Sequence, residues 1–305
     1  MPCFHPMKGY RARRAEPSGK RRIVFNKKDG FEDLPVTVPC GQCAGCRLER
    51  SRQWAIRCMH EASLYDQNCF ITLTYNNEHL PDDRSLNVRD FQLFMKRLRK
   101  KYGADIRFFH CGEYGSKLGR PHYHACLFNF DFADKELFKL SNDVPLYRSN
   151  SLEQLWPFGF STIGDVTFES AAYVARYVMK KVNGDAAKDH YQYVDPVSGE
   201  VHQLKPEYIT MSRRPGIGRD WIEKFRDDVY PGDFVVVRGK KCRPPRYYDR
   251  EYEIMDPDGF KEIKRQRKSA SAEHADNNTP ARLKVREKVQ LSKLRRLPRS
   301  LEDDL

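Results

Sequence analysis

The chain has 305 residues, a length that fits one large domain or one core domain with extensions. It carries 55 lysine and arginine residues against 42 aspartate and glutamate residues, and this net charge of +13 favours a polyanionic partner, usually nucleic acid. No apolar run is long enough to span a bilayer and no apolar signal region is visible, so we expect neither a membrane partner nor export.

The cysteines point to a metal site. Nine cysteines is an odd number, and their clustered spacing favours thiols or a metal over disulfides. Cys40, Cys43 and Cys46 follow a C-x2-C-x2-C spacing, which suits a tetrahedral zinc ion that has one further ligand. Cys3 or His5 can supply that ligand, because the N-terminal segment is long enough to fold back. Metal-free thiols and an iron–sulfur cluster stay open as alternatives, although the downstream Cys-Pro of such clusters is missing.

Charge and composition divide the chain into three parts. Residues 1–39 are basic and irregular in pattern, which predicts a positively charged arm that is either solvated or in contact with phosphates. A core domain is expected over 40–237. Residues 238–305 are densely charged and have few aromatic residues, so we predict a basic tail that is helical or partly disordered.

The core alternates between signals for helices and signals for strands. Apolar residues at intervals of three and four predict helices, whereas runs of β-branched and aromatic residues predict strands. The expected helices span 47–65, 87–102 with Asn87 as N-cap, and 169 or 170 to about 182, capped by Glu169 or Ser170 and stopped at Asn183 and Gly184. The expected strands span 69–75, 106–112, 120–128, 160–166 and 234–237. We predict a mixed insertion over 131–159 with a short helix at 134–140, and a basic Gly- and Pro-rich loop followed by a short helix over 211–225.

The strand RPHYHACLF carries two histidines at alternate positions. Because strand side chains alternate between faces, His122 and His124 point the same way and Tyr123 points into the opposite layer. Two imidazoles on one face can bind a single divalent ion, although two buried strand histidines without a metal would look the same. A turn over 113–119 joins this strand to the preceding one in an antiparallel hairpin, which puts Glu113 near the mouth of the histidine strand.

The helix near 170–182 carries two tyrosines and a lysine. Tyr173 and Tyr177 are four residues apart and share one face, with Lys180 one turn further along. A separate apolar seam that can pack on the sheet consists of Val174, Val178 and Val182. A packed aromatic pair without a catalytic role would show the same tyrosine spacing. The choice between these interpretations depends on whether the strand 69–75, the histidine strand and the tyrosine helix together support one reaction.

That chemistry is consistent with cleavage of a phosphodiester. A tyrosine phenolate can attack phosphorus and form a covalent phosphotyrosine. A divalent ion polarises the non-bridging oxygens, and a lysine such as Lys180 can offset developing charge or favour the phenolate. The reaction leaves a free 3′-OH, which can start DNA synthesis.

The order and identity of these residues resemble the HUH endonucleases of rolling-circle replication, and more closely the replication initiators of the microviruses, in particular their gokushovirus-like branch. The resemblance covers about residues 39–221 and combines several motifs, which makes it specific. The segments that carry it are PCGQCAGCRLERSRQWAIRCMHEAS, CFITLTYN, HCGEYGSKLGRPHYHACLFNF, LWPFGFSTIGDVTFESAAYVARYVMKK and MSRRPGIGRDW.

This resemblance implies an α+β fold, with an antiparallel sheet of about five strands and helices on its outer face. It implies that His122 and His124 are ligands of Mg²⁺ or Mn²⁺, with Glu113 as a third ligand by position. Tyr173 and Tyr177 match a two-tyrosine subclass in which the nucleophiles alternate between initiation and termination. Tyr177 ranks first because it is closest to Lys180, which matches the lysine of this motif. The cysteine knuckle is shared by the branch but is not required by the wider catalytic family.

We therefore expect an origin-nicking endonuclease and strand transferase that acts on single-stranded DNA in the host bacterial cytoplasm, together with host helicase and polymerase. A transposase or relaxase with the same chemistry is an alternative that differs in its DNA substrate. A third reading is a non-enzymatic, zinc-dependent protein that binds nucleic acid by phosphate contacts and base stacking.

Overall fold

The computed structural model describes residues 3–17, 19–115, 119–141, 143–180, 186–195 and 198–296, without the side chains of 177–180 and 186. The chain forms two compact units. The terminal unit combines Met1–Arg50 with Gln266–Pro298, and the sheet unit combines Ser51–Arg265 with Arg299–Leu305. Among the described helices, none has both the length and the apolar character needed to cross a bilayer.

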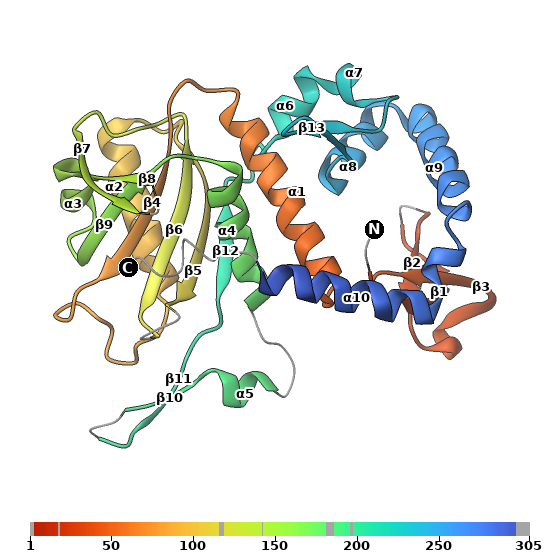
Figure 1. Ribbon diagram of the computed structural model, residues 1–305, viewed down its shortest axis with the longest axis horizontal. Helices are drawn as coiled ribbons and strands as arrows, with labels where there is room; N and C mark the ends of the chain where they lie inside the picture. The colour runs from red at the N-terminus through yellow and green to blue at the C-terminus, as the bar shows by residue number, and fades with distance from the viewer. Residues whose placement is uncertain are drawn as a thin grey trace. The chain divides into compact units, whose positions relative to one another are not determined.

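A seven-stranded antiparallel sheet organises the sheet unit (Figure 1), with strands in the order β12-β5-β6-β4-β9-β8-β7. Its strands are β4 (Asn68–Tyr75), β5 (Arg107–Tyr114), β6 (Pro121–Phe128), β7 (Lys135–Ser141), β8 (Val144–Ser149), β9 (Gly159–Gly164) and β12 (Tyr208–Met211). The predicted α+β class and antiparallel sheet are confirmed, but the sheet has seven strands instead of about five. The short helix expected at 134–140 was wrong. Residues there form the hairpin β7–β8, and Asp143 takes up the left-handed conformation of a tight turn at φ +64°.

Helices cover both faces of this sheet, whereas the sequence suggested one. On one face, Leu73 and Leu127 pack against Phe94 of α2. On the opposite face, Phe128 packs with Val174 of α4 and with the C-terminal half of α1. The helices concerned are α1 (Ala44–Ala62), α2 (Val88–Tyr102), α3 (Asn150–Leu155) and α4 (Phe168–Lys180). Each fully buried leucine or phenylalanine of these layers contributes about 1.5–3 kcal/mol, so the two cores fix which side of the sheet each strand residue faces.

Side-chain caps fix where two of these helices begin. The Asn87 side chain accepts a hydrogen bond from the Arg89 N–H at 3.0 Å, which confirms the predicted cap of α2. For α4, the prediction of Glu169 or Ser170 as cap was wrong by two or three residues. Thr167 accepts from the Ser170 N–H at 3.1 Å, and Ser170 Oγ accepts from the Thr167 N–H at 2.8 Å. The predicted stop at 183–184 lies outside the described residues.

Smaller elements complete the sheet unit. They are α5 (Ala186–His190), β10 (Gln192–Val194), β11 (Val201–Gln203), α6 (Arg219–Lys224), α7 (Arg226–Val229), β13 (Val235–Val237), β14 (Lys240–Cys242) and α8 (Arg246–Met255). The basic loop after β12 is held by the fully buried Glu61, which pairs with Arg107 and accepts from the Gly218 N–H at 2.6 Å. This carboxylate therefore anchors the loop to α1, since losing either bond would leave a buried charge without a partner.

His60 gives the sheet unit an acid-sensitive contact. Its ring stacks on Trp221 with ring centroids 3.5 Å apart, and Nδ1 lies 2.9 Å from the Tyr248 hydroxyl. Burial lowers the pKa of His60 to about 4. The unfolded chain binds a proton there at about pH 6.5, so folding stability falls as the pH drops from about 6.5 to about 4, by up to about 3 kcal/mol.

The test compares the wild type with His60→Phe, which keeps an aromatic ring but cannot be protonated. Free energies of unfolding from denaturant titrations are measured at pH 7 and pH 4.5. We expect the wild type to lose more stability than the variant on acidification. Equal losses would show that other groups carry the acid sensitivity.

The terminal unit contains strands where the sequence predicted an irregular arm. The sheet order is β2-β1-β3, formed by β1 (Met7–Ala15), β2 (Arg21–Val24) and β3 (Gly30–Val38), with η1 (Lys27–Asp29) between the last two. Tyr10 and Ala12 lie on one face of β1 and are buried, while Arg11 and Arg13 are exposed. Short polar strands of this kind depend on long-range pairing more than on local pattern. The predicted domain boundaries after residues 39 and 237 stay predictions.

The C-terminal segment is helical. After α8, it forms α9 (Pro257–Ala272), the short η2 (Asp276–Asn278) and α10 (Pro280–Arg295). This agrees with the helical version of the predicted tail. Most of α10 is solvent-exposed, with Leu283 as its buried residue.

Candidate active site

The register of three strands brings the predicted ligand residues together. On β6, His122 lies directly opposite Glu113 of β5 and Thr74 of β4, and His124 lies opposite Thr72. Directly opposed residues share a face of the sheet, so these side chains point toward the layer that contains α4. Glu113 is part of β5, not the first residue of the turn as predicted, and this places its carboxylate among the histidines.

Two threonines orient the imidazoles. Thr74 Oγ1 lies 2.9 Å from His122 Nδ1, and Thr72 Oγ1 lies 3.0 Å from His124 Nδ1. A hydroxyl can donate or accept, so each threonine supports either tautomer and leaves Nε2 for a ligand. Sequence reasoning assigned no role to these threonines. The available signal was their alternation in the strand 69–75, which puts both on one face of that strand; the register of β4 and β6 makes it the face that carries the histidines.

Glu113 links the histidine pair to the tyrosine helix. Its Oε1 lies 2.8 Å from His124 Nε2 and accepts a hydrogen bond from the Tyr173 hydroxyl at 3.2 Å. The Tyr173 ring meets the His124 ring edge-on, with centroids 5.1 Å apart and an angle of 89° between the rings. The structure therefore brings His122, His124, Glu113 and Tyr173 into one cluster. All four residues are less than a tenth exposed.

Burial keeps one histidine of this cluster neutral. Desolvation lowers the pKa of His122 to about 3, and the neighbouring His124 and Arg120 act in the same direction. An imidazole binds a metal through a neutral ring nitrogen, so His122 is in the protonation state that a ligand needs at pH 7. Gly115 lies close to the same ring. A Cβ added at Gly115 would be 2.6 Å from His122 Nε2, so a side chain at this position would clash with the imidazole.

The donor set suits a divalent ion, although the described side chains do not surround one. Two imidazoles with a carboxylate fit Mn²⁺ well, and the carboxylate also fits Mg²⁺. The two histidine rings have centroids 6.3 Å apart. Within the described part of the chain, this trio is not among the groups whose ligand atoms all lie within 4.8 Å of one another. Binding an ion would replace the contact between His124 and Glu113.

The structure places the remaining predicted residues only in part. Tyr177 and Lys180 lie in α4, but their side chains are outside the described residues, as are those of Val178 and Val182. Val174 of the predicted apolar seam is fully buried against the sheet. The preference for Tyr177 as first nucleophile therefore stays a prediction, and Tyr173 is the tyrosine seen to contact the cluster.

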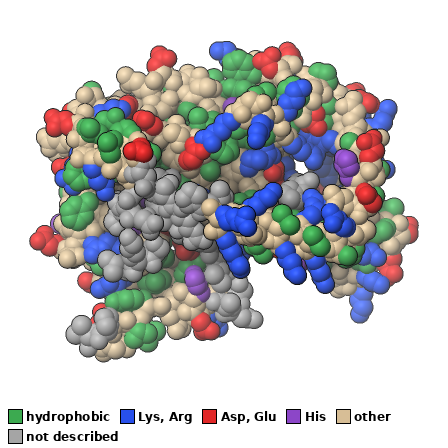
Figure 2. All heavy atoms as spheres, in the orientation of Figure 1, with side chains coloured by type: hydrophobic (Ala, Val, Ile, Leu, Met, Phe, Trp, Pro, Cys, Tyr) green, Lys and Arg blue, Asp and Glu red, His purple; other side chains and the backbone are tan. Residues whose placement is uncertain are grey.

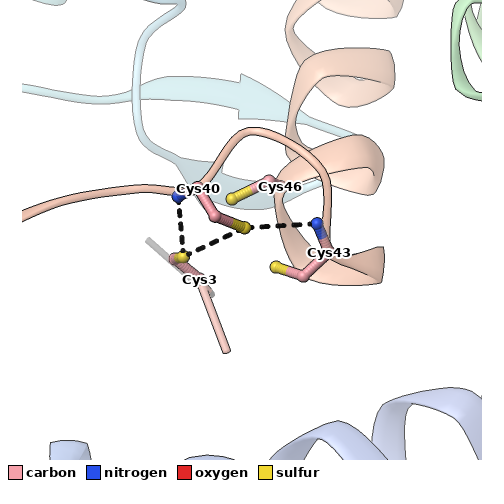
Figure 3. Close-up of side chains that lie close together, drawn as sticks. All are labelled: Cys3, Cys40, Cys43 and Cys46. Carbon is pink, nitrogen blue, oxygen red and sulfur yellow. Dashed lines mark hydrogen bonds between the residues drawn. The ribbon is translucent and has the colours of Figure 1, made fainter. Parts of the chain in front are cut away.

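A second candidate site is the cysteine knuckle of the terminal unit (Figure 3). The sulfurs of Cys3, Cys40, Cys43 and Cys46 all lie within 4.8 Å of one another. Cys3 Sγ is 3.8 Å from Cys40 Sγ, which matches the edge of about 3.8 Å in a tetrahedron with Zn–S bonds of about 2.3 Å. Of the two candidates for the fourth ligand, Cys3 is in place, whereas His5 contacts Glu287. The group is compatible with structural zinc.

Backbone N–H groups prepare these sulfurs for negative charge. The Phe4 N–H donates to Cys43 Sγ and the Cys40 N–H donates to Cys3 Sγ, both at 3.3 Å. Burial opposes ionisation, but the N–H groups of Phe4 and Cys46, together with the neighbouring thiols of Cys46 and Cys40, outweigh it at Cys43 and lower the pKa of that thiol to about 7. Burial raises the pKa of Cys46 and of Cys3. A cation is therefore needed before all four thiols can be ionised together.

Comparisons with known proteins place the chain among phage replication proteins. A family model described as replication-associated protein ORF2/G2P matches residues 68–182. Replication-associated protein VP4 of Bdellovibrio phage phiMH2K is 34% identical over 288 residues, covering 90% of this chain and 85% of the relative. The chain belongs to the family of microvirus-type replication-associated proteins.

Other members of this family have similar levels of sequence identity to this chain. Replication-associated protein ORF2 of Spiroplasma virus 4 is 32% identical over 282 residues, covering 85% of this chain and 83% of the relative. Replication-associated protein ORF4 of Chlamydia phage 1 is 38% identical over 233 residues, covering 72% and 55%. No solved structure shows a significant match. The region matched by the family model runs from β4 through α4, so it contains every residue of the histidine cluster.

For this family member, we expect about one equivalent of zinc per chain. Metal analysis of the purified full-length protein, together with its visible absorption spectrum, measures this and distinguishes zinc from an iron–sulfur cluster. Cys43→Ser should lose the zinc, because three thiolates and water bind it far less tightly. Cys242→Ser is the matched control, since Cys242 lies outside the cluster, in the sheet unit. A folded wild type without metal would contradict the zinc interpretation.

Proposed function

We propose that this protein initiates rolling-circle replication by nicking single-stranded origin DNA with a tyrosine, and later rejoins the strand. The observation that carries the proposal is the position of Glu113, whose Oε1 contacts both His124 and the phenol of Tyr173. A potential nucleophile and a pair of candidate metal ligands thus share one carboxylate. Family membership supports a replication role over a transposase or relaxase role.

The side chains divide the work as follows. His122 and His124 would hold the divalent ion, with Thr74 and Thr72 fixing their rings. When bound, Mg²⁺ or Mn²⁺ supplies Lewis-acid polarisation of a non-bridging phosphate oxygen. Glu113 accepts a hydrogen bond from the Tyr173 hydroxyl, and this contact supports a role for Glu113 as acceptor of the phenol proton. Its predicted role as a third ligand is an alternative use of the same carboxylate.

The proposed reaction is a transesterification. The Tyr173 phenol gives its proton to Glu113, and the phenolate oxygen forms a bond to phosphorus. The bond from phosphorus to the 3′ oxygen breaks, that oxygen takes up a proton from water, and Glu113 returns the phenol proton to solvent. The products are a 5′-phosphotyrosine and a free 3′-OH. Attack of a 3′-OH on the phosphotyrosine reverses the step and rejoins the strand, and Tyr177 is the proposed second nucleophile.

Access of DNA to this site requires movement. His122, Glu113 and Tyr173 are 8%, 3% and 4% exposed, which is too little for a phosphate group to contact them directly. We place this activity in the host bacterial cytoplasm, where a host helicase would separate the strands and a host polymerase would extend the 3′-OH.

The test is an adduct assay on the full-length protein. Single-stranded DNA that contains the origin of the phage's own genome is labelled on the 3′ side of the expected nick, so that the label stays with the 5′-phosphate. It is incubated with the protein and Mn²⁺, and a denaturing gel then reports labelled DNA that migrates with the protein. We expect an adduct that EDTA prevents. DNA binding without any adduct would overturn the proposal in favour of a non-enzymatic binding protein.

A further inference from the structure

The net positive charge of the chain lies almost entirely in one of its two units. The terminal unit has 20 lysine and arginine residues against 8 aspartate and glutamate residues, a net charge of +12. The sheet unit has 35 against 34, a net charge of +1. The unit that carries the histidine cluster is therefore almost neutral, and electrostatic attraction of a polyanion must come from the other unit.

Helix α10 presents part of this charge on an exposed face. Lys284, Lys288 and Arg295 are exposed and lie within about 40° of one another around the helix, at 100° per residue. On the opposite side Lys293 is also exposed, whereas two arginines there are engaged: Arg282 and Arg286 donate to Asn277, and Arg286 also donates to Asn278. Figure 2 shows lysine and arginine side chains along this helix.

The row of cations formed by Lys284, Lys288 and Arg295 is also long enough to contact several phosphates. Eleven residues separate its ends, which is about 16 Å at 1.5 Å per residue. A DNA strand presents a phosphate about every 3.4 Å along a helix axis, so about five phosphates fall within that span. Three cations on one side of a straight helix can therefore each meet a phosphate of the same strand.

The helix is tied to the segment that contains the cysteine knuckle. Thr279 caps its N-terminus, and Leu283 is buried. His5, two residues after the zinc-ligand candidate Cys3, contacts both carboxylate oxygens of Glu287 at 2.9 Å. These contacts connect the N-terminal segment to α10 within one unit, so folding of the knuckle also positions α10.

We propose that the terminal unit is a DNA-binding surface in which Lys284, Lys288 and Arg295 of α10 contact backbone phosphates. The proposal takes its ligand, DNA, from the proposed function. It assigns affinity for DNA to the terminal unit and strand cleavage to the sheet unit. Binding there depends on released counterions, so it is independent of sequence and falls steeply with salt.

The experiment measures the affinity of the full-length protein for labelled single-stranded DNA of mixed sequence over a range of salt concentrations. The test variant combines Lys284→Gln, Lys288→Gln and Arg295→Gln, which keeps good helix formers at each position. Loss of three phosphate contacts should reduce the slope of log K against log salt by about 2 and weaken binding roughly tenfold or more at low salt.

The matched control removes the same charge from an exposed helix of the sheet unit, with Lys96→Gln, Lys100→Gln and Lys101→Gln in α2. We expect its slope and affinity to stay within about twofold of the wild type. Equal losses in both variants would show that only net charge matters, and an unchanged α10 variant would also overturn the proposal. Circular dichroism confirms that both variants fold. Adduct formation at saturating DNA is scored separately, so the nicking proposal and this proposal fail on different readouts.

Discussion

Replacing Tyr173 and Tyr177 together by phenylalanine should abolish the covalent protein–DNA adduct, with a loss on the order of 10³-fold or more. Phenylalanine keeps the ring and most of the packing of Tyr173 on the sheet but removes the oxygen that would attack phosphorus. Binding of DNA should be unchanged, because the proposed binding surface lies in the terminal unit. An undiminished adduct from the double variant would exclude both tyrosines as nucleophiles.

The single variants identify which tyrosine acts first. Tyr173 contacts Glu113 directly. The short spacing between Tyr177 and Lys180 instead favours Tyr177 as the first nucleophile. If Tyr173→Phe alone removes the first adduct, the hydrogen bond to Glu113 marks the initiating nucleophile. If Tyr177→Phe does so, the sequence ranking is correct. Tyr102→Phe is a suitable control because Tyr102 is exposed at the end of α2, away from the cluster.

Replacing His122 or His124 by alanine should reduce metal-dependent nicking by on the order of 10³-fold, since a bound ion contributes several kcal/mol of transition-state stabilisation. Single-turnover nicking rates as a function of Mn²⁺ concentration measure this effect. Thr72→Val and Thr74→Val keep the side-chain shape but remove the contact to Nδ1, so we expect metal affinity to fall about 10- to 100-fold. His274→Ala, an exposed histidine of the terminal unit, is the control. Full activity of the His122→Ala, His124→Ala double variant would exclude the pair as ligands.

Glu113→Gln separates the two uses of that carboxylate. If Glu113 accepts the phenol proton, raising the pH toward the ordinary tyrosine pKa of about 10 should restore part of the rate, because the phenol then ionises without help. If Glu113 is chiefly a ligand, raising the Mn²⁺ concentration should restore it instead. The same rate measurements at two pH values and two metal concentrations distinguish these outcomes.

Several features of the site were predictable from local patterns. Period-two alternation put His122 and His124 on one face of a strand, and the spacing of four put Tyr173 and Tyr177 on one face of a helix, beside an apolar seam. The cap at Asn87 and the C-x2-C-x2-C spacing are equally local signals. Together with the resemblance to microvirus initiators, these patterns were sufficient to identify the family.

The partners of these residues depended on the tertiary structure. Thr72 and Thr74 reach the histidines, and Glu113 lies opposite His122, only through the register of β4, β5 and β6. Register between strands far apart in sequence is set by packing on both faces, which no local pattern encodes.

The sequence by itself determined the family, the α+β class, and the residue types that could perform the chemistry, because periodicity, capping and motif spacing act over a few residues. Only the tertiary structure decided that Cys3 completes the cysteine cluster and that residues 1–50 and 266–298 form one basic unit. Those contacts join residues 37 or more positions apart, and their formation depends on long-range burial and pairing rather than on local preference.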